Sequence, residues 1–140
     1  MMPTLVLFHI RWAWSAMMVG IFSGATLGLG FHRDEFLNGY QSFERRTMRL
    51  GHIACFGMGF INLLFAGTVW ALNMQPQLAS HCFITALVGM PLVCFLSAWH
   101  KPFRHLFVVP VAALTVGIVE TIMLLDPFSM GPTIALAIPL

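Results

Sequence analysis

The side chains best suited to chemistry in this sequence are its six histidines, which stand in a chain with few charged residues. His52 opens an apolar stretch that runs from Arg49 to Trp70 and also contains Cys55 and Asn62. At the helical advance of about 100° per residue, His52, Cys55 and Asn62 fall within an arc of about 80°. In a membrane span, an imidazole and an amide on one stripe are expected to face protein rather than lipid.

His52 and His105 form the first candidate pair for a cofactor. Each opens a predicted apolar span just inside a basic residue, Arg49 for the first and Arg104 for the second. Two imidazoles at equal depth on diagonal helices provide the axial ligands of a haem b iron, and arginines can pair with its propionates. The alternative is that both histidines lie at the membrane interface and hydrogen-bond to loop backbone.

His9 and His81 form a second candidate pair, on the opposite side of the membrane. His9 lies several residues inside its span and His81 near the start of its own, so their depths differ by several Å at about 1.5 Å per residue. A second haem b is one interpretation of this pair, and a histidine at the level of the lipid headgroups is the other. On the first side, His32 and His100 lie near His52 and His105, which permits a further interpretation, a metal centre.

Arg11 and Glu120 are the two charged residues farthest inside the apolar spans. Both lie about two helical turns from the same side of the membrane, and their helices are predicted neighbours. We expect a buried ion pair, because pairing removes the cost of two separate charges in lipid. The functional alternative makes Glu120 a proton-transfer group beside a quinone headgroup, with Arg11 adjusting its proton affinity.

Two further features predict helix packing. The first span carries small residues at a spacing of four, which form a groove for close helix approach, at Gly20, Gly24 and Gly28. Asn62 lies near the middle of the second span, where a polar side chain is expected to hydrogen-bond to another helix, with Thr115 or Ser97 as its partner.

Four helical spans must position all of these residues. Hydrophobic residues make up 59% of the 140 residues and charged residues only 9%, against roughly 25% in soluble domains. Such a chain cannot cover a water-facing surface, so we predict an all-α integral membrane protein with one membrane domain, residues 1–140. The spans cover about 4–30, 48–73, 79–99 and 105–125, with a polar loop at 31–47 and an apolar tail at 126–140.

The links between the spans predict the topology. The links at 31–47 and 100–104 are basic, whereas the link at 74–77 carries no charge. By the positive-inside rule we expect the basic links on the cytoplasmic side of a bacterial-type inner membrane and both termini outside. Short links make consecutive helices antiparallel neighbours, which predicts a bundle of four transmembrane helices with up-down-up-down topology.

These features favour a redox function. The sequence contains no Ser/His/Asp triad, phosphate-binding glycine loop or CxxC pair, which argues against hydrolases and nucleotidases. In topology alone, the predicted bundle resembles the four-helix b-type cytochromes. We predict a membrane-embedded electron-transfer protein or oxidoreductase subunit that holds one or two haem b groups, exchanges electrons with quinone and joins a larger membrane complex, without a nucleic-acid partner. Two alternatives stay open, a cofactor-free accessory subunit and a small proton-coupled transporter that uses Arg11, Asn62 and Glu120.

Overall fold

Four long α-helices form the fold of this protein. The computed structural model describes residues 3–125, and the predicted tail at 126–140 lies outside the described residues. The elements, in chain order, are α1 (Thr4–Gly30), the 3-10 helix η1 (Phe36–Asn38), α2 (Phe43–Leu72), α3 (Gln77–Trp99), the 3-10 helix η2 (Lys101–Phe107) and α4 (Val108–Leu125). All four α-helices are long and apolar enough to span a membrane, the fourth when it is taken together with η2.

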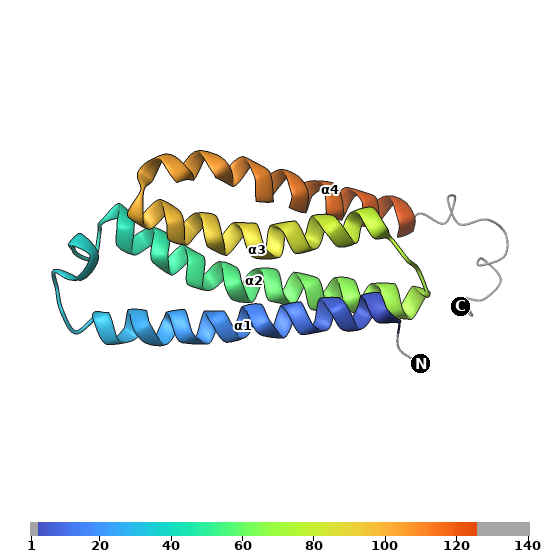
Figure 1. Ribbon diagram of the computed structural model, residues 1–140, viewed down its shortest axis with the longest axis horizontal. Coiled ribbons are helices and arrows are strands. Elements are labelled where there is room, and N and C mark those ends of the chain that lie inside the picture. Colours follow the sequence, from blue (N-terminus) through green and yellow to red (C-terminus); the bar gives the residue numbers. More distant parts are fainter. Residues whose placement is uncertain (1–2, 126–140) are drawn as a thin grey trace.

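The helices pack side by side in chain order (Figure 1). The chain doubles back after each helix, so the start of α1 and the end of α4 lie at the same end of the molecule. α4 packs mainly against α3; Leu114 also reaches the apolar cluster of α2 and α3, but α4 does not pack against α1. The prediction that the first and fourth spans are neighbours is therefore wrong.

Two glycines explain why α4 stays on α3. A methyl group on Gly89 would lie 3.1 Å from Pro110 Cβ, and one on Gly117 would lie 3.2 Å from Cys82 Cβ. The two helices thus meet at both ends of their contact through positions where a larger side chain would not fit without a shift. This close approach places the inner face of α4 on α3 and leaves most of the α4 surface uncovered within one chain.

The glycine groove predicted on the first span is confirmed at two of its three positions. A methyl group on Gly20 would lie 2.6 Å from the Phe56 ring, and one on Gly24 would lie 2.5 Å from His52 Cε1. Gly28 meets no atom within 4 Å. The absence of side chains at Gly20 and Gly24 therefore lets α1 receive two aromatic rings from α2.

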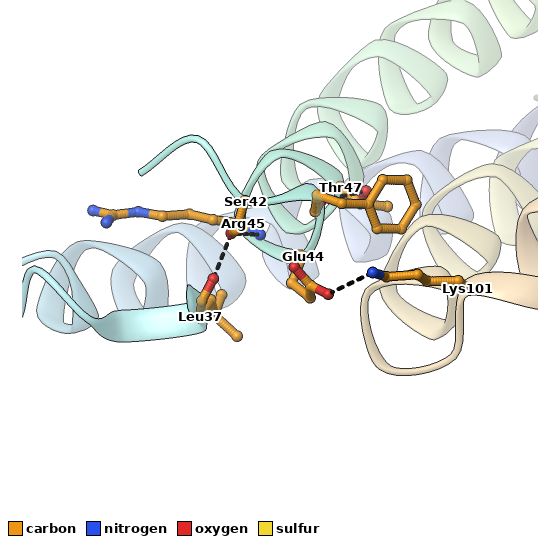
Figure 2. Close-up of polar contacts among 7 residues, drawn as sticks. Leu37, Ser42, Glu44, Arg45, Thr47 and Lys101 are labelled. Atoms are coloured by element: carbon orange, nitrogen blue, oxygen red, sulfur yellow. Dashed lines mark hydrogen bonds and ion pairs between the residues drawn. The ribbon is translucent and has the colours of Figure 1, made fainter. Parts of the chain in front are cut away.

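α2 begins at residue 43, earlier than the predicted start at 48, because its first turn is capped. Ser42 Oγ accepts a hydrogen bond from the Arg45 backbone N–H at 3.1 Å and donates one to Leu37 O (Figure 2). Serine at this position satisfies a backbone donor that the helix itself leaves free. Part of the predicted polar loop is thus helical.

The fourth helix begins later than predicted. His105, which was expected to open the span, lies in η2, and α4 starts at Val108. η2 packs against α3 and α4, and its first residue extends to α2, where Lys101 Nζ lies 3.5 Å from Glu44 Oε1 (Figure 2). A surface ion pair therefore links α2 and η2 at the loop end of the molecule. His105 on η2 is exposed.

Candidate functional site

A fully buried histidine joins the first three helices. His9 on α1 is 0% exposed, and its ring lies between Asn62 on α2 and Ser80 on α3. The Nδ1 atom is 2.8 Å from Asn62 Oδ1, and the Nε2 atom is 2.8 Å from Ser80 Oγ. Both ring nitrogens therefore have hydrogen-bond partners inside the bundle.

The hydrogen bonds of Asn62 assign the protons of this network. Asn62 Nδ2 donates to Met58 O at 2.9 Å and to Phe83 O at 3.4 Å, so Oδ1 faces His9 as an acceptor. An acceptor there requires the proton on His9 Nδ1. The neutral ring then accepts the Ser80 hydroxyl at Nε2, whereas the protonated ring donates to the Ser80 oxygen. The same contact thus accommodates both protonation states of His9.

Asn62 hydrogen-bonds to another helix, but not to the partners expected from the sequence. It contacts His9 and Phe83 O, whereas Thr115 hydrogen-bonds within α4. Ser97 is buried, and its hydroxyl has no hydrogen-bond partner. The prediction of Thr115 or Ser97 is wrong because the Thr115 hydroxyl is exposed and donates to Val111 O, and because Ser97 lies near the far end of α3.

Ser80 is not among the site residues predicted from the sequence. The signal that would have found it is helical spacing. Ser80, Phe83 and Leu87 recur at i, i+3 and i+7 and are all buried on α3. A serine on the buried stripe of an apolar helix is expected to have a polar partner on a neighbouring helix.

Ser80 also lines a cleft of about 590 Å³ between the starts of α1 and α3. The polar side chains of the cleft come from α1, from α3 and from the link that precedes α3: Thr4, Gln75, Gln77, Ser80, His81 and Thr85. Phe8 and Ile84 add apolar walls. Since the Ser80 hydroxyl contacts His9 Nε2, the buried histidine is connected to this cleft through one side chain.

A second, apolar groove of about 270 Å³ follows further along the same two helices. Trp12 and Val19 line it from α1, Leu87 and Phe95 from α3, and Cys55 from α2. Trp12 lies one helical turn beyond Phe8 of the cleft, so the polar cleft and the apolar groove are consecutive along α1. A polar cleft followed by an apolar groove suits a ligand with a polar head and a hydrocarbon tail.

His52 occupies a separate position, against α1. Its Nδ1 atom donates to Gly20 O at 2.8 Å and lies 3.4 Å from Ser23 Oγ. The ring contacts Phe56 edge to face, with ring centroids 5.3 Å apart. The carbonyl acceptor requires a ring proton on Nδ1, so in the neutral ring Nε2 keeps its lone pair.

The two histidines of the first predicted haem pair lie in different parts of the molecule. His52 faces α1, whereas His105 is exposed on η2, which packs against α3 and α4. The arginines expected at the propionates are also apart, since Arg49 lies over the Tyr40 ring at 4.6 Å and Arg104 is exposed on η2. The structure thus shows no contact that assembles these four residues into one site.

Of the second predicted pair, only His81 lines the cleft, and His9 is connected to it through Ser80. His81 lines the cleft and is exposed, whereas both nitrogens of His9 are engaged by Asn62 and Ser80. Iron ligation by His9 would require one of these hydrogen bonds to break.

The metal centre that was one interpretation of the histidines near the loop end is not assembled. Within residues 3–125, no three His, Cys, Asp or Glu side chains come together in a group that could hold a metal ion. His32 lies in the connection after α1 and His100 at the end of α3, and both are exposed. His32 and His100 thus lie at the same end of the bundle, but they do not form a metal site.

Arg11 and Glu120 do not form the predicted ion pair. α1 and α4 lie at opposite edges of the row of helices, and the ion pair found among residues 3–125 is that of Lys101 with Glu44. Arg11 is exposed, while Glu120 is partly buried and its Oε2 atom has no hydrogen-bond partner. A transport path through Arg11, Asn62 and Glu120 is likewise not assembled within one chain.

Comparisons with known proteins find no match to the chain. No protein-family model matches the chain. Neither a curated protein nor a solved structure is significantly similar to it.

Proposed function

We propose that the protein is a four-span integral membrane protein with up-down-up-down topology that binds a quinone as a subunit of an electron-transfer complex. The observation that carries this proposal is the cleft between α1 and α3, whose Ser80 wall is hydrogen-bonded to the buried His9. Under the positive-inside rule, the arginine-rich loop end faces the cytoplasm of a bacterial-type cell. The cleft then lies at the outer surface, where both termini are expected.

The chemistry of the cleft matches the two parts of a quinone. The carbonyl oxygens of the headgroup are acceptors, and the amide of Gln77 and the imidazole of His81 supply donors. The isoprenoid tail is apolar and flexible, as the groove beside Trp12 and Leu87 requires. A free polar metabolite would leave the apolar groove unused.

The contact between Ser80 and His9 supplies a proton route. Reduction of a quinone to the quinol takes up two electrons and two protons. The Ser80 hydroxyl gives its proton to an oxygen of the reduced quinone, and protonated His9 restores it from Nε2, which supplies one of the two protons and leaves His9 neutral. Water in the open cleft supplies the second proton to the other quinone oxygen and later returns a proton to His9 through Ser80. Asn62 keeps the ring in place through Nδ1 during the transfer. The electrons come from a redox centre of the complex, and quinol oxidation runs the same steps in reverse.

Haem b stays a prediction from the sequence. The residues present do not fit a haem ligated by both His52 and His105, because His52 faces α1 and η2 packs on α3 and α4. One observation favours His52 as a single ligand: its Nδ1–H bond to Gly20 O leaves Nε2 available and fixes the ring orientation. No step of the proposed quinone chemistry runs through haem.

Binding of a short-tailed ubiquinone analogue to the purified protein tests the quinone proposal. Trp12 lines the apolar groove, so a bound quinone is expected to quench its fluorescence in a saturable way. The measurement uses a variant whose other tryptophans, Trp14, Trp70 and Trp99, are replaced by phenylalanine. Loss of one hydrogen bond is worth about 0.5–1.5 kcal/mol, so His81→Phe is expected to weaken binding about 2–10-fold.

Ser97→Ala is the matched control, because Ser97 is buried on the same helix but lies outside both the cleft and the groove. It is expected to leave the affinity unchanged. Saturable quenching that is unaffected by His81→Phe would place the quinone elsewhere. A lack of saturable quenching in the parent protein would refute quinone binding and favour the cofactor-free accessory subunit.

A further inference from the structure

An unpaired charge lies on the outer face of α1. Arg11 is exposed and lines a shallow hollow of that face together with Leu7, Phe8 and Trp12. It stands seven residues after the start of α1, which corresponds to a depth of about 10 Å at 1.5 Å per residue. The residues that face α2, such as Ala13, are about 160° away around the helix, so Arg11 points away from the rest of the chain.

A second unpaired charge lies at the same level on α4. Glu120 stands five residues before the end of α4, a depth of about 8 Å from the same end of the molecule. Its Oε2 atom is buried against the protein but has no hydrogen-bond partner. Glu120 lies three residues after Gly117, the point at which α4 meets α3, so its carboxylate lies on the side of α4 that carries this helix contact.

Both charges need a partner at this depth. A charged side chain costs about 2.5–3.5 kcal/mol at the centre of a membrane helix on insertion scales, and charged residues within membrane spans almost always pair with one another. Within one chain the pair cannot form, because α1 and α4 occupy opposite edges of the row of helices. The depths of Arg11 and Glu120 nevertheless agree within about 3 Å.

A second copy of the chain supplies the missing partners. All copies have the same orientation in a membrane, so Arg11 of one copy and Glu120 of another lie at matching depth. The edge helices are also the least covered: 11% of the most apolar part of α4 and 28% of that of α1 is buried within one chain, against 44% for α3. We propose that the protein self-associates in the membrane, with α1 of one copy packed against α4 of the next and Arg11 paired with Glu120. This inference is independent of quinone binding.

The contact is expected to close into a symmetric assembly. A two-fold axis along the membrane normal places α1 opposite α4 twice and forms two equal ion pairs, whereas a head-to-tail arrangement of the same contact forms a ring. In the two-fold assembly and in the ring alike, every Arg11 is paired with a Glu120 of another copy.

Charge reversal in two separately tagged copies tests the proposal. In Arg11→Glu, the glutamate faces Glu120 of an identical copy, and in Glu120→Arg the arginine faces Arg11. Each variant alone is expected to lose self-association at least tenfold in detergent micelles, measured by light scattering and by energy transfer between labelled copies. When the two variants are mixed, each altered residue meets an opposite charge, so association is expected to return and the two tags to co-purify.

Arg33→Glu is the control, because Arg33 is an exposed arginine in the connection after α1 and its reversal is expected to change nothing. The neutral variants Arg11→Gln and Glu120→Gln replace the reversed ones if those fail to fold, as judged by helical circular dichroism. Each neutral variant is expected to weaken association severalfold. A monomeric parent protein overturns the proposal, as does retention of full association in the reversed or neutral single variants or a failure of the mixture to associate.

Discussion

Two serines on α3 provide a matched test of the His9 network. Ser80 donates to or accepts from His9 Nε2 at 2.8 Å, whereas the Ser97 hydroxyl is buried and has no hydrogen-bond partner. Their exposed fractions are similar, 6% and 0%. Ser80→Ala and Ser97→Ala therefore remove the same atom from the same helix, and they differ in whether that atom has a partner.

Ser80→Ala is expected to lower the free energy of unfolding, whereas Ser97→Ala is expected to leave it unchanged or to raise it. Hydrogen bonds between membrane helices contribute about 0.6 kcal/mol on average and about 1.7 kcal/mol at most. Ser80→Ala leaves Nε2 of the fully buried His9 without a donor, so we expect a loss of about 1 kcal/mol in the free energy of unfolding. Ser97→Ala removes a buried hydroxyl that is unsatisfied, so it is expected to be neutral or to stabilise by up to about 1 kcal/mol.

Unfolding of the protein in mixed micelles with increasing SDS, followed by circular dichroism, measures both variants. A double-mutant cycle with His9→Leu isolates the contact, and the coupling with Ser80→Ala is expected to be about 1 kcal/mol. The same cycle with Ser97→Ala is expected to show no coupling. The reasoning is refuted if the two serine variants lose equal stability, or if Ser80 and His9 do not couple.

Two further predictions concern the α1 groove and its histidine. Gly24→Ala places a methyl group 2.5 Å from His52 Cε1 and is expected to lower the free energy of unfolding by about 1–3 kcal/mol, while Gly28→Ala meets no atom within 4 Å and is expected to have little effect. Equal thermal stabilities of these two variants would contradict the packing. If the sequence-based haem prediction holds, the purified protein shows a b-type band in a reduced-minus-oxidised spectrum. That band is expected to disappear in His52→Ala and to persist in His105→Ala, and the opposite pattern would exclude His52 as the ligand.

The helices themselves follow from local properties of the sequence. The first and third α-helices match the predicted spans closely, at Thr4–Gly30 and Gln77–Trp99, because long apolar runs have no stable alternative to a helix in lipid. The starts of the second and fourth differ, since the Ser42 cap extends one helix into the polar loop and η2 delays the other. Such ends depend on local backbone contacts that an apolar run does not encode.

The composition of the sequence determined that this is a chain of membrane-type helices, and the i+4 glycines determined a face for close packing. Which polar residues meet was decided only by the tertiary structure. Asn62 lies 53 residues after His9 in the sequence, and Ser80 lies 71 residues after it. No spacing rule relates positions on different helices. The placement of α4 on α3, at the edge opposite α1, likewise separates Arg11 from Glu120, because helix order in a bundle depends on which surfaces fit.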